Sequence, residues 1–167
     1  VALVATAVFN GISQGSQPLL SDYYGKNDDK SVQKILRLSI ITGIAAAVLI
    51  ILVTNLIPDV IVAVFNSENN AEMASYAVFG VQLYFTGFLF AGFNIIGTGF
   101  LSATESAAWA FITSVLRGFV AISLCALLLS ALFGMTGVWL AFPVAEFITA
   151  VLMVIAIAQN VRKMRTK

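Results

Sequence analysis

Six polar side chains recur at helical spacing near the start of a chain that is otherwise apolar there. They are Asn10, Ser13, Gln14, Ser16, Gln17 and Ser21. Asn10, Gln14, Gln17 and Ser21 follow one another at intervals of four, three and four positions, which puts them on one side of a helix. Amide and hydroxyl groups are hydrogen-bonding groups, so this stripe is suited to binding a solute, water or another helix.

Within a membrane, such a face must meet either other helices or water, because an unpaired polar group in hydrocarbon costs several kcal/mol. One interpretation is that Asn10, Gln14 and Gln17 line a substrate cavity. The other is hydrogen bonding between helices, aided by Gly11 and Gly15, whose GxxxG spacing allows close approach. Pro18 follows the stripe and frees the carbonyl of Gln14, so we expect a helix kink there.

Arg117 and Glu146 are the two charges inside the last long apolar region, residues 106–161. Counted from the turn between their helices, their depths differ by roughly six residues, or ~9 Å, which two long side chains could nearly close. We therefore expect each to be the other's partner. The pair could fix the packing of two helices, Glu146 could carry a proton-linked or substrate-linked role, or Arg117 could reach the cytoplasmic interface.

Further polar side chains lie in the apolar segment 73–104, among closely spaced glycines. Those glycines are Gly80, Gly87, Gly92, Gly97 and Gly99, for which we favour tight helix packing. Gln82 and Asn94 could equally line a cavity or join helices.

Composition defines the class: 60% of residues are hydrophobic, 10% are charged and the mean hydropathy is +0.98. Soluble domains carry about 25% charged residues, so this is an integral membrane protein. With one cysteine, Cys125, and no histidine, the sequence excludes a disulfide framework and the commonest metal sites. Motifs for nucleotide binding, zinc-dependent hydrolysis and serine hydrolysis are absent, so we expect no enzyme, no bound cofactor or metal, and no nucleic-acid partner.

The apolar segments predict an all-α polytopic bundle of five transmembrane helices, at about residues 1–20, 35–57, 73–102, 107–132 and 138–160. We place the last break at FGMTG, residues 133–137, where glycines flank a short polar turn. A rival would make residues 118–140 one span. Because the chain starts at Val1 without methionine, within an apolar segment, we expect a longer parent protein.

This topology places the basic residues on one side of the membrane. They are Lys26, Lys30, Lys34, Arg37, Arg162, Lys163, Arg165 and Lys167, with Asp59, Glu68 and Glu72 on the other side. By the positive-inside rule the basic side and the C-terminus are cytoplasmic. Trp109 and Trp139 then fall at opposite interfaces, as aromatic belts do.

Three stretches, in order, resemble the multidrug and toxic compound extrusion (MATE) family. QGSQPLLSDYYGKNDDKSVQK (14–34) is similar to its QPLIS-x-x-YGA signature with a following basic run. FNIIGTGFLSATESAAWAFITSVLRG (93–118) and FGMTGVWLAFPVAEFITAV (133–151) resemble its late helices. The resemblance implies that the chain is most of the C-terminal lobe of a twelve-helix transporter, helices eight to twelve, with the N-terminal lobe missing.

The family implies two six-helix lobes facing a central cavity, and export of amphipathic, often cationic compounds coupled to inward Na⁺ or H⁺ flow. Carried over, Gln17 and Pro18 match the QP motif, Glu105 the turn after the tenth helix, Arg117 the LRG motif and Glu146 the P-x-x-E motif. One departure is that residues 73–102 contain no acidic residue where some branches couple cations. Coupling would then rest on Glu146 or on a carboxylate in the missing lobe.

We therefore expect secondary active multidrug efflux by cation antiport, with alternating access, in a bacterial-type plasma membrane. The cavity wall would comprise Asn10, Gln14, Gln17, Gln82 and Asn94, with Pro18 as a bending point. Alone, the fragment is not expected to transport. Two alternatives stay open: a lipid-linked oligosaccharide flippase of the same superfamily, which would favour a more basic cavity, and a non-transporting membrane scaffold whose polar stripe is closed to water.

Overall fold

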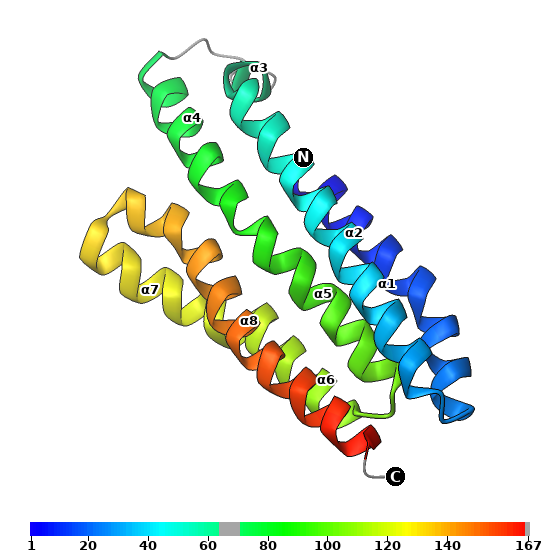
Figure 1. The fold of residues 1–167 in the computed structure, drawn as a ribbon. Coiled ribbons are helices and arrows are strands. Elements are labelled where there is room, and N and C mark those ends of the chain that lie inside the picture. The colour runs from blue at the N-terminus through cyan, green and yellow to red at the C-terminus, as the bar shows by residue number, and fades with distance from the viewer. Residues whose placement is uncertain (64–70, 166–167) are drawn as a thin grey trace.

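A computed structural model describes residues 1–63 and 71–165, and this part of the chain is an all-helical bundle without strands (Figure 1). Its elements are α1 (Ala2–Gly25), α2 (Asp29–Leu56), α3 (Pro58–Ala63), α4 (Ala71–Thr86), α5 (Phe88–Ala103), α6 (Ala107–Val115), the π-helical segment η1 (Leu116–Ala121), α7 (Ile122–Phe133) and α8 (Met135–Arg165). The all-α polytopic bundle predicted from the sequence is confirmed.

Four helical stretches among the described residues are long and apolar enough to cross a membrane, where the sequence predicted five spans. They are Asp29–Leu56, Tyr76–Ala103, Ala107–Phe133 and Met135–Met164. The first expected span, residues 1–20, is helical as part of α1 but is not among the four. Its stripe of amides and hydroxyls explains this, because polar side chains lower the mean hydropathy of a helix. Such a helix can still be buried by packing against its neighbours.

The chain breaks where the sequence predicted, at Gly134, whose φ of 58° ends α7. This left-handed conformation suits glycine and excludes a continuous helix through residues 118–140. Two interruptions were not predicted. Gly87 separates α4 from α5, and the six residues of η1 widen the helix around Arg117.

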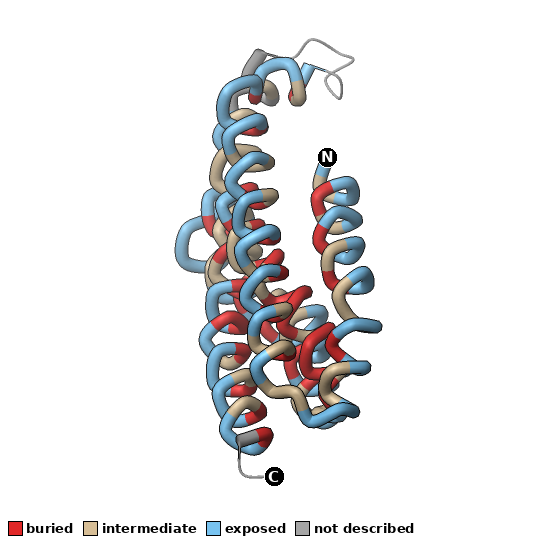
Figure 2. Tube along the Cα trace, turned by 45° about the vertical axis from the view of Figure 1, so that its right-hand side comes forward, coloured by how far each residue is buried: buried red, intermediate tan, exposed pale blue. Residues whose placement is uncertain are grey.

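Helix α5 is the centre of the bundle and packs against α1, α2, α6 and α8 (Figure 1). The continuous η1–α7 stretch forms a hairpin with α8, while α4 lies against α2 and α8. The largest group of mutually packed buried side chains, which includes Leu20, Phe100 and Met153, joins α1, α5 and α8. Buried residues gather most densely in the half of the bundle nearest the C-terminus (Figure 2).

The α1–α2 turn lies at the same end of the bundle as the C-terminus (Figure 1). Asp28 starts α2 by accepting hydrogen bonds from the backbone N–H of Ser31 at 3.1 Å and from its hydroxyl at 2.6 Å. These bonds lower the pKa of the Asp28 carboxyl. Lys26 pairs with Asp22 at 2.7 Å, and this bond raises the pKa of the lysine.

Apart from Arg117, the described basic residues thus belong to segments at this end of the molecule, and Asp59 of α3 lies beyond the other end of α2. Glu68 and Lys167 lie outside the described residues, as do the side chains of Glu72 and Arg165.

The glycines of α4 and α5 mark close helix contacts, as the sequence predicted. A Cβ on Gly80 would meet Trp139, one on Gly92 would meet Phe9, and one on Gly97 would meet Met153. By contrast, Gly11 and Gly15 face open space, so their GxxxG spacing joins α1 to no described helix. The close approach between α1 and α5 instead uses the glycines of α5, which leaves the Gly11 and Gly15 face of α1 uncovered.

Candidate functional site

A polar cleft of about 260 Å³ lies between α1, α5 and the segment formed by α6 and η1. Its polar lining comes from Asn10, Ser13, Gln14 and Gln17 of α1, from Thr98 and Ser102 of α5, and from Ser114 and Arg117 of the α6–η1 segment. Arg117 is the only charged residue in this lining. Four residues of the stripe predicted on α1 thus form one side of an open cleft. The other two, Ser16 and Ser21, do not line it, and their hydroxyls donate to the carbonyls of Ser13 and Ala103.

The cleft wall is held together by a few specific contacts between α1 and α5. The Ser13 hydroxyl donates to the Ile95 carbonyl at 3.3 Å and accepts from the Gln17 amide at 3.5 Å. Both groups reach α5 because Gly99 has no side chain, and a Cβ there would overlap the Ser13 hydroxyl. Thr98 and Ser102 donate back to carbonyls of their own helix.

The amides of Asn10 and Gln14 are free to bind a solute. Both residues are exposed, and neither side chain makes a hydrogen bond to another described residue. An amide offers two donors and an acceptor, so these groups suit water or a polar ligand in the cleft.

Next to the cleft, Arg117 and Glu146 form an ion pair, with the arginine Nε 2.8 Å from the glutamate Oε1. Asn94 of α5 donates through Nδ2 to Glu146 Oε2 at 2.7 Å and to the Glu146 backbone carbonyl at 2.9 Å. Glu146 is 4% exposed and Asn94 is fully buried. The Arg117 side chain keeps 29% of its surface exposed and reaches the cleft, so this triad joins the cleft to the protein interior.

The π-helical segment explains how Arg117 reaches its partner. A π-helical turn holds an extra residue, which changes the direction of the side chains around it, and such segments are frequent at functional sites. Glu146 comes from α8, three residues after Pro143, which lies against the α4–α5 break at Gly87. The two unpredicted irregularities therefore both lie near the triad.

Asn94 keeps one polar atom without a partner. Among the described residues, its Oδ1 is the only buried side-chain nitrogen or oxygen that makes no hydrogen bond. The amide is oriented by the carboxylate, because only Nδ2 can donate to it.

The structure brings three of the predicted cavity residues together, Asn10, Gln14 and Gln17, and it separates the other two from them. Asn94 does not line the cleft, since its amide is committed to Glu146 in the interior. Gln82 does not line it either, because α4 lies beyond the Gly87 break and packs on α2 and α8. Pro18 lies inside α1, which continues unbroken to Gly25.

Ser102 and Ser114 complete the cleft and were not predicted. Ser114 lies three residues before Arg117 in the sequence, a helical spacing that could have indicated a shared face.

No group of three or more histidine, cysteine or acidic side chains that could hold a metal occurs within residues 1–63 and 71–165. Cys125 is buried beside Ala121, Ala141 and Ala145, which fits the role of a small apolar filler.

Comparisons with known proteins agree with one another. A family model described as MatE matches residues 1–127. The chain is 27% identical over 145 residues to a multidrug export protein, MepA, of Staphylococcus saprophyticus, covering 86% of this chain and 31% of that protein. It is 29% identical over 147 residues to the MepA of Staphylococcus haemolyticus, covering 87% of this chain and again 31% of the relative.

The fold is also similar to that of a solved structure, the outward-facing conformation of a multidrug resistance MATE family transporter of the MOP superfamily. The TM-score is 0.91 at 10% sequence identity, over 99% of this chain and 37% of that one. The chain therefore spans about a third of the length of the proteins that it matches.

Proposed function

Because the chain belongs to the MATE family of multi-pass membrane transporters, we propose that it forms one wall of the drug path in a cation-coupled efflux pump. The protein that contains it would export amphipathic, often cationic compounds by alternating access, with its basic end in the cytoplasm of a bacterial-type cell. The remainder of the parent protein would supply the facing wall.

The polar cleft is the observation that carries this proposal. Amides of α1 without hydrogen-bond partners line it, on one side of a bundle that is otherwise apolar. The lining contains no side chain that could act as a nucleophile with an adjacent base. Such a surface binds solutes through weak and adaptable hydrogen bonds, which suits a pump that handles several compounds. No catalytic step is needed to explain any residue of the cleft.

We assign the coupling role to the ion pair at the cleft edge. While Glu146 is ionised, it neutralises Arg117, and a cationic drug can occupy the cleft. When Glu146 takes up a proton, the charge of Arg117 is left uncompensated beside the drug. Two unit charges ~8 Å apart repel by about 2 kcal/mol at an effective dielectric constant of about 20, equivalent to roughly 30-fold in affinity.

A proton fits this position better than Na⁺ does. Both carboxylate oxygens of Glu146 already accept hydrogen bonds, and their neighbours, the Arg117 guanidinium and the Asn94 amide nitrogen, are donors. Na⁺ requires several oxygen ligands, whereas a proton requires one. Protonated Glu146 could also donate to the free Oδ1 of Asn94 after rotation of the amide.

Alternating access then follows from differing affinities of the two conformations for drug and for proton. A ligand shifts a conformational equilibrium only by the difference between its affinities for the two states. If drug and proton exclude each other at one edge of the cleft, binding of the proton releases the drug and binding of the drug releases the proton. Antiport requires this kind of coupling.

The alternatives are less well supported. A flippase for an anionic lipid-linked sugar favours a basic cavity, but the only cation in this lining is neutralised by Glu146. A scaffold favours a polar stripe closed by other helices, whereas Asn10 and Gln14 are exposed.

The test is ethidium efflux by the full-length protein in a pump-deficient host, with an imposed H⁺ or Na⁺ gradient. Gln14→Leu and Gln17→Leu are expected to reduce efflux severalfold at equal membrane expression. Gln82→Leu is the matched control, because it makes the same exchange outside the cleft and is expected to retain efflux. If all three variants export normally, the cleft is not the drug path, and efflux driven only by Na⁺ would remove the proton assignment.

A further inference from the structure

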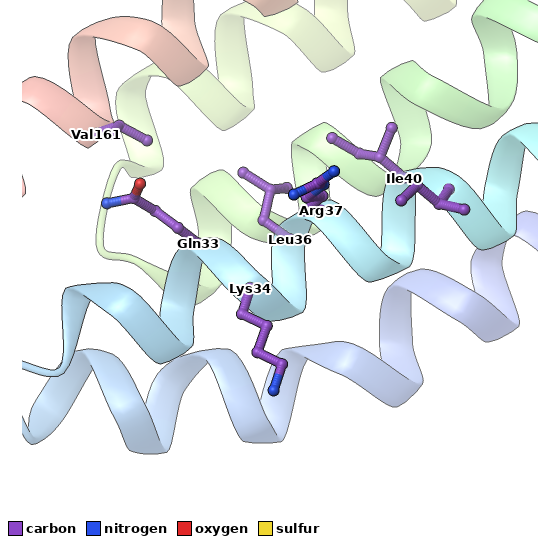
Figure 3. Close-up of a pocket in the computed structure, with 7 residues that line it drawn as sticks. Gln33, Lys34, Leu36, Arg37, Ile40 and Val161 are labelled. Atoms are coloured by element: carbon purple, nitrogen blue, oxygen red, sulfur yellow. The ribbon is translucent and has the colours of Figure 1, made fainter.

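A second groove lies at the basic end of the bundle, between the first turns of α2 and the end of α8, and has a volume of about 730 Å³. It shares no lining residue with the polar cleft and is shown in Figure 3. Its lining consists of Gln33, Lys34, Leu36, Arg37, Ile40, Ile41 and Val161.

The polar side chains of the lining all come from one end of the groove, and beyond Arg37 the lining from α2 is apolar. Gln33, Lys34 and Arg37 lie toward the α1–α2 turn, with the apolar Leu36 and Val161 beside them, and Ile40 follows further along α2 (Figure 3). Ile41, the next residue in the chain, is also part of the lining. From residue 33 to residue 41 the helix rises about 12 Å. That distance is enough to pass from the headgroup region of a bilayer into its hydrocarbon. A phospholipid has its polar headgroup and its apolar acyl chains in the same order.

Neither cation of the groove pairs with an acidic side chain in the described part of the chain. Lys26 pairs with Asp22 and Arg117 pairs with Glu146, whereas Lys34 and Arg37 form no ion pair with a described residue. Acidic side chains are absent from the lining given above. Lys34 extends from the other flank of α2 (Figure 3), but its flexible stem allows the ammonium group to reach a ligand in the groove.

The groove is continuous with an exposed apolar surface of α2. Ile41 is 52% exposed and begins a row of exposed apolar residues along α2. That row continues with Ile44, Val48, Leu49 and Leu52. An acyl chain attached to a headgroup in the groove would lie along this row without crossing polar surface.

We propose that this groove binds an anionic phospholipid of the cytoplasmic leaflet, with its phosphate between Lys34 and Arg37 and an acyl chain along Ile40 and Ile41. Basic pockets between transmembrane helices on the cytoplasmic side have the chemistry for such headgroups. Each basic residue near the membrane surface contributes roughly 5-fold to the affinity for anionic lipid, so the two together give roughly 30-fold over a zwitterionic lipid.

The test is native mass spectrometry of the full-length protein with equal amounts of phosphatidylglycerol and phosphatidylcholine. The wild type is expected to retain phosphatidylglycerol with a preference of roughly 30-fold, which falls to near unity in Lys34→Gln/Arg37→Gln. The control Lys26→Gln/Lys30→Gln removes the same charge from the same end but leaves the groove intact, so its preference should persist. Equal loss in both variants, or no preference in the wild type, would overturn the proposal.

A second measurement locates the lipid. A bimane label on Val161→Cys, in a Cys125→Ala background, is expected to be quenched more by brominated phosphatidylglycerol than by brominated phosphatidylcholine. A label shielded from both lipids would mean that another part of the parent protein fills the groove, and the lipid site would be rejected. Neither measurement uses transport, so their outcome is independent of the proposed efflux function.

Discussion

Arg117 and Glu146 are the residues on which the proposed coupling depends, and their environment limits what each can do. The Glu146 carboxylate is buried and accepts hydrogen bonds from two different helical segments. Removing one partner of a buried ion pair typically costs 3–5 kcal/mol, about as much as the whole stability of a marginal domain, because the other charge is left uncompensated. The same sensitivity allows a single proton to have a large effect here.

Glu146→Gln is expected to weaken ethidium binding to the full-length protein roughly 30-fold and to abolish its pH dependence. The glutamine mimics the protonated carboxyl and leaves the charge of Arg117 uncompensated at the cleft. Affinity measured by fluorescence titration across a range of pH checks this. In the wild type, ethidium affinity should be higher at high pH than at low pH, because the proposed mechanism makes proton and drug exclude each other.

The double variant Glu146→Gln/Arg117→Met separates charge from folding. It removes both charges, so binding should recover toward the wild-type value at high pH and should not vary with pH. If Glu146→Gln still binds with the wild-type pH dependence, the titrating group lies elsewhere, and a coupling carboxylate outside this chain becomes the better explanation.

At the scale of elements, α5 determines the geometry of the cleft because its glycines allow α1 to approach. Gly92 accommodates the Phe9 ring, and Gly99 accommodates Ser13 and Gln17. The α5 helix also carries Asn94 on the side that faces α8. One helix therefore positions the cleft wall on one face and the Glu146 carboxylate on another.

Gly99→Ala is expected to destabilise the protein by about 1–3 kcal/mol, because the added methyl overlaps the Ser13 hydroxyl. Ser13→Ala removes that oxygen and leaves the Ser13 Cβ 3.4 Å from the new methyl, so the double variant should regain most of the loss. Thermal unfolding of the full-length protein in detergent checks both.

Gly11→Ala is the matched control for this pair. Its new methyl would meet nothing within 4 Å, and alanine favours helix by up to about 1 kcal/mol over glycine. Its unfolding temperature should therefore be unchanged or slightly higher. A double variant as unstable as Gly99→Ala alone would show that backbone contact, and not the Ser13 hydroxyl, limits the approach of α1 to α5.

On the scale of the whole molecule, the two ends of the bundle differ in charge, because the α1–α2 turn and the C-terminal segment carry most of the lysine and arginine residues. Lys30 lies in the first turn of α2, at the end that also holds the C-terminus, while Asn55 lies in the last turn of the same helix. If the basic end is cytoplasmic, this fixes which side of the membrane the lipid groove faces and how the polar cleft and the ion pair are oriented relative to it.

Cysteine labelling in a Cys125→Ala background tests this orientation in the full-length protein. With a membrane-impermeant maleimide on intact cells, Asn55→Cys is expected to be labelled, while Lys30→Cys and Gln159→Cys are expected to be labelled only after the membrane is opened. Labelling of Lys30→Cys in intact cells would reverse the orientation and would place the groove beside the outer leaflet.

The sequence by itself determined the class, the helices and much of the polar surface. Composition and the length of the apolar runs are enough to identify membrane helices, because a bilayer core requires about 20 apolar residues per crossing. Local rules placed the break at Gly134, and helical spacing placed Asn10, Gln14 and Gln17 on one face. These features depend on residues close together in the chain.

Only the tertiary structure decided which polar residues face the cleft and which are buried. Asn94 and Gln82 have the same polarity and similar surroundings in the sequence, yet one holds a carboxylate and the other lies on a separate helix beyond Gly87. The π-helical segment and the open face of Gly11 and Gly15 likewise depend on contacts between helices distant in sequence. A single helix cannot reveal its partners, because the same small or polar residue suits either a neighbouring helix or water.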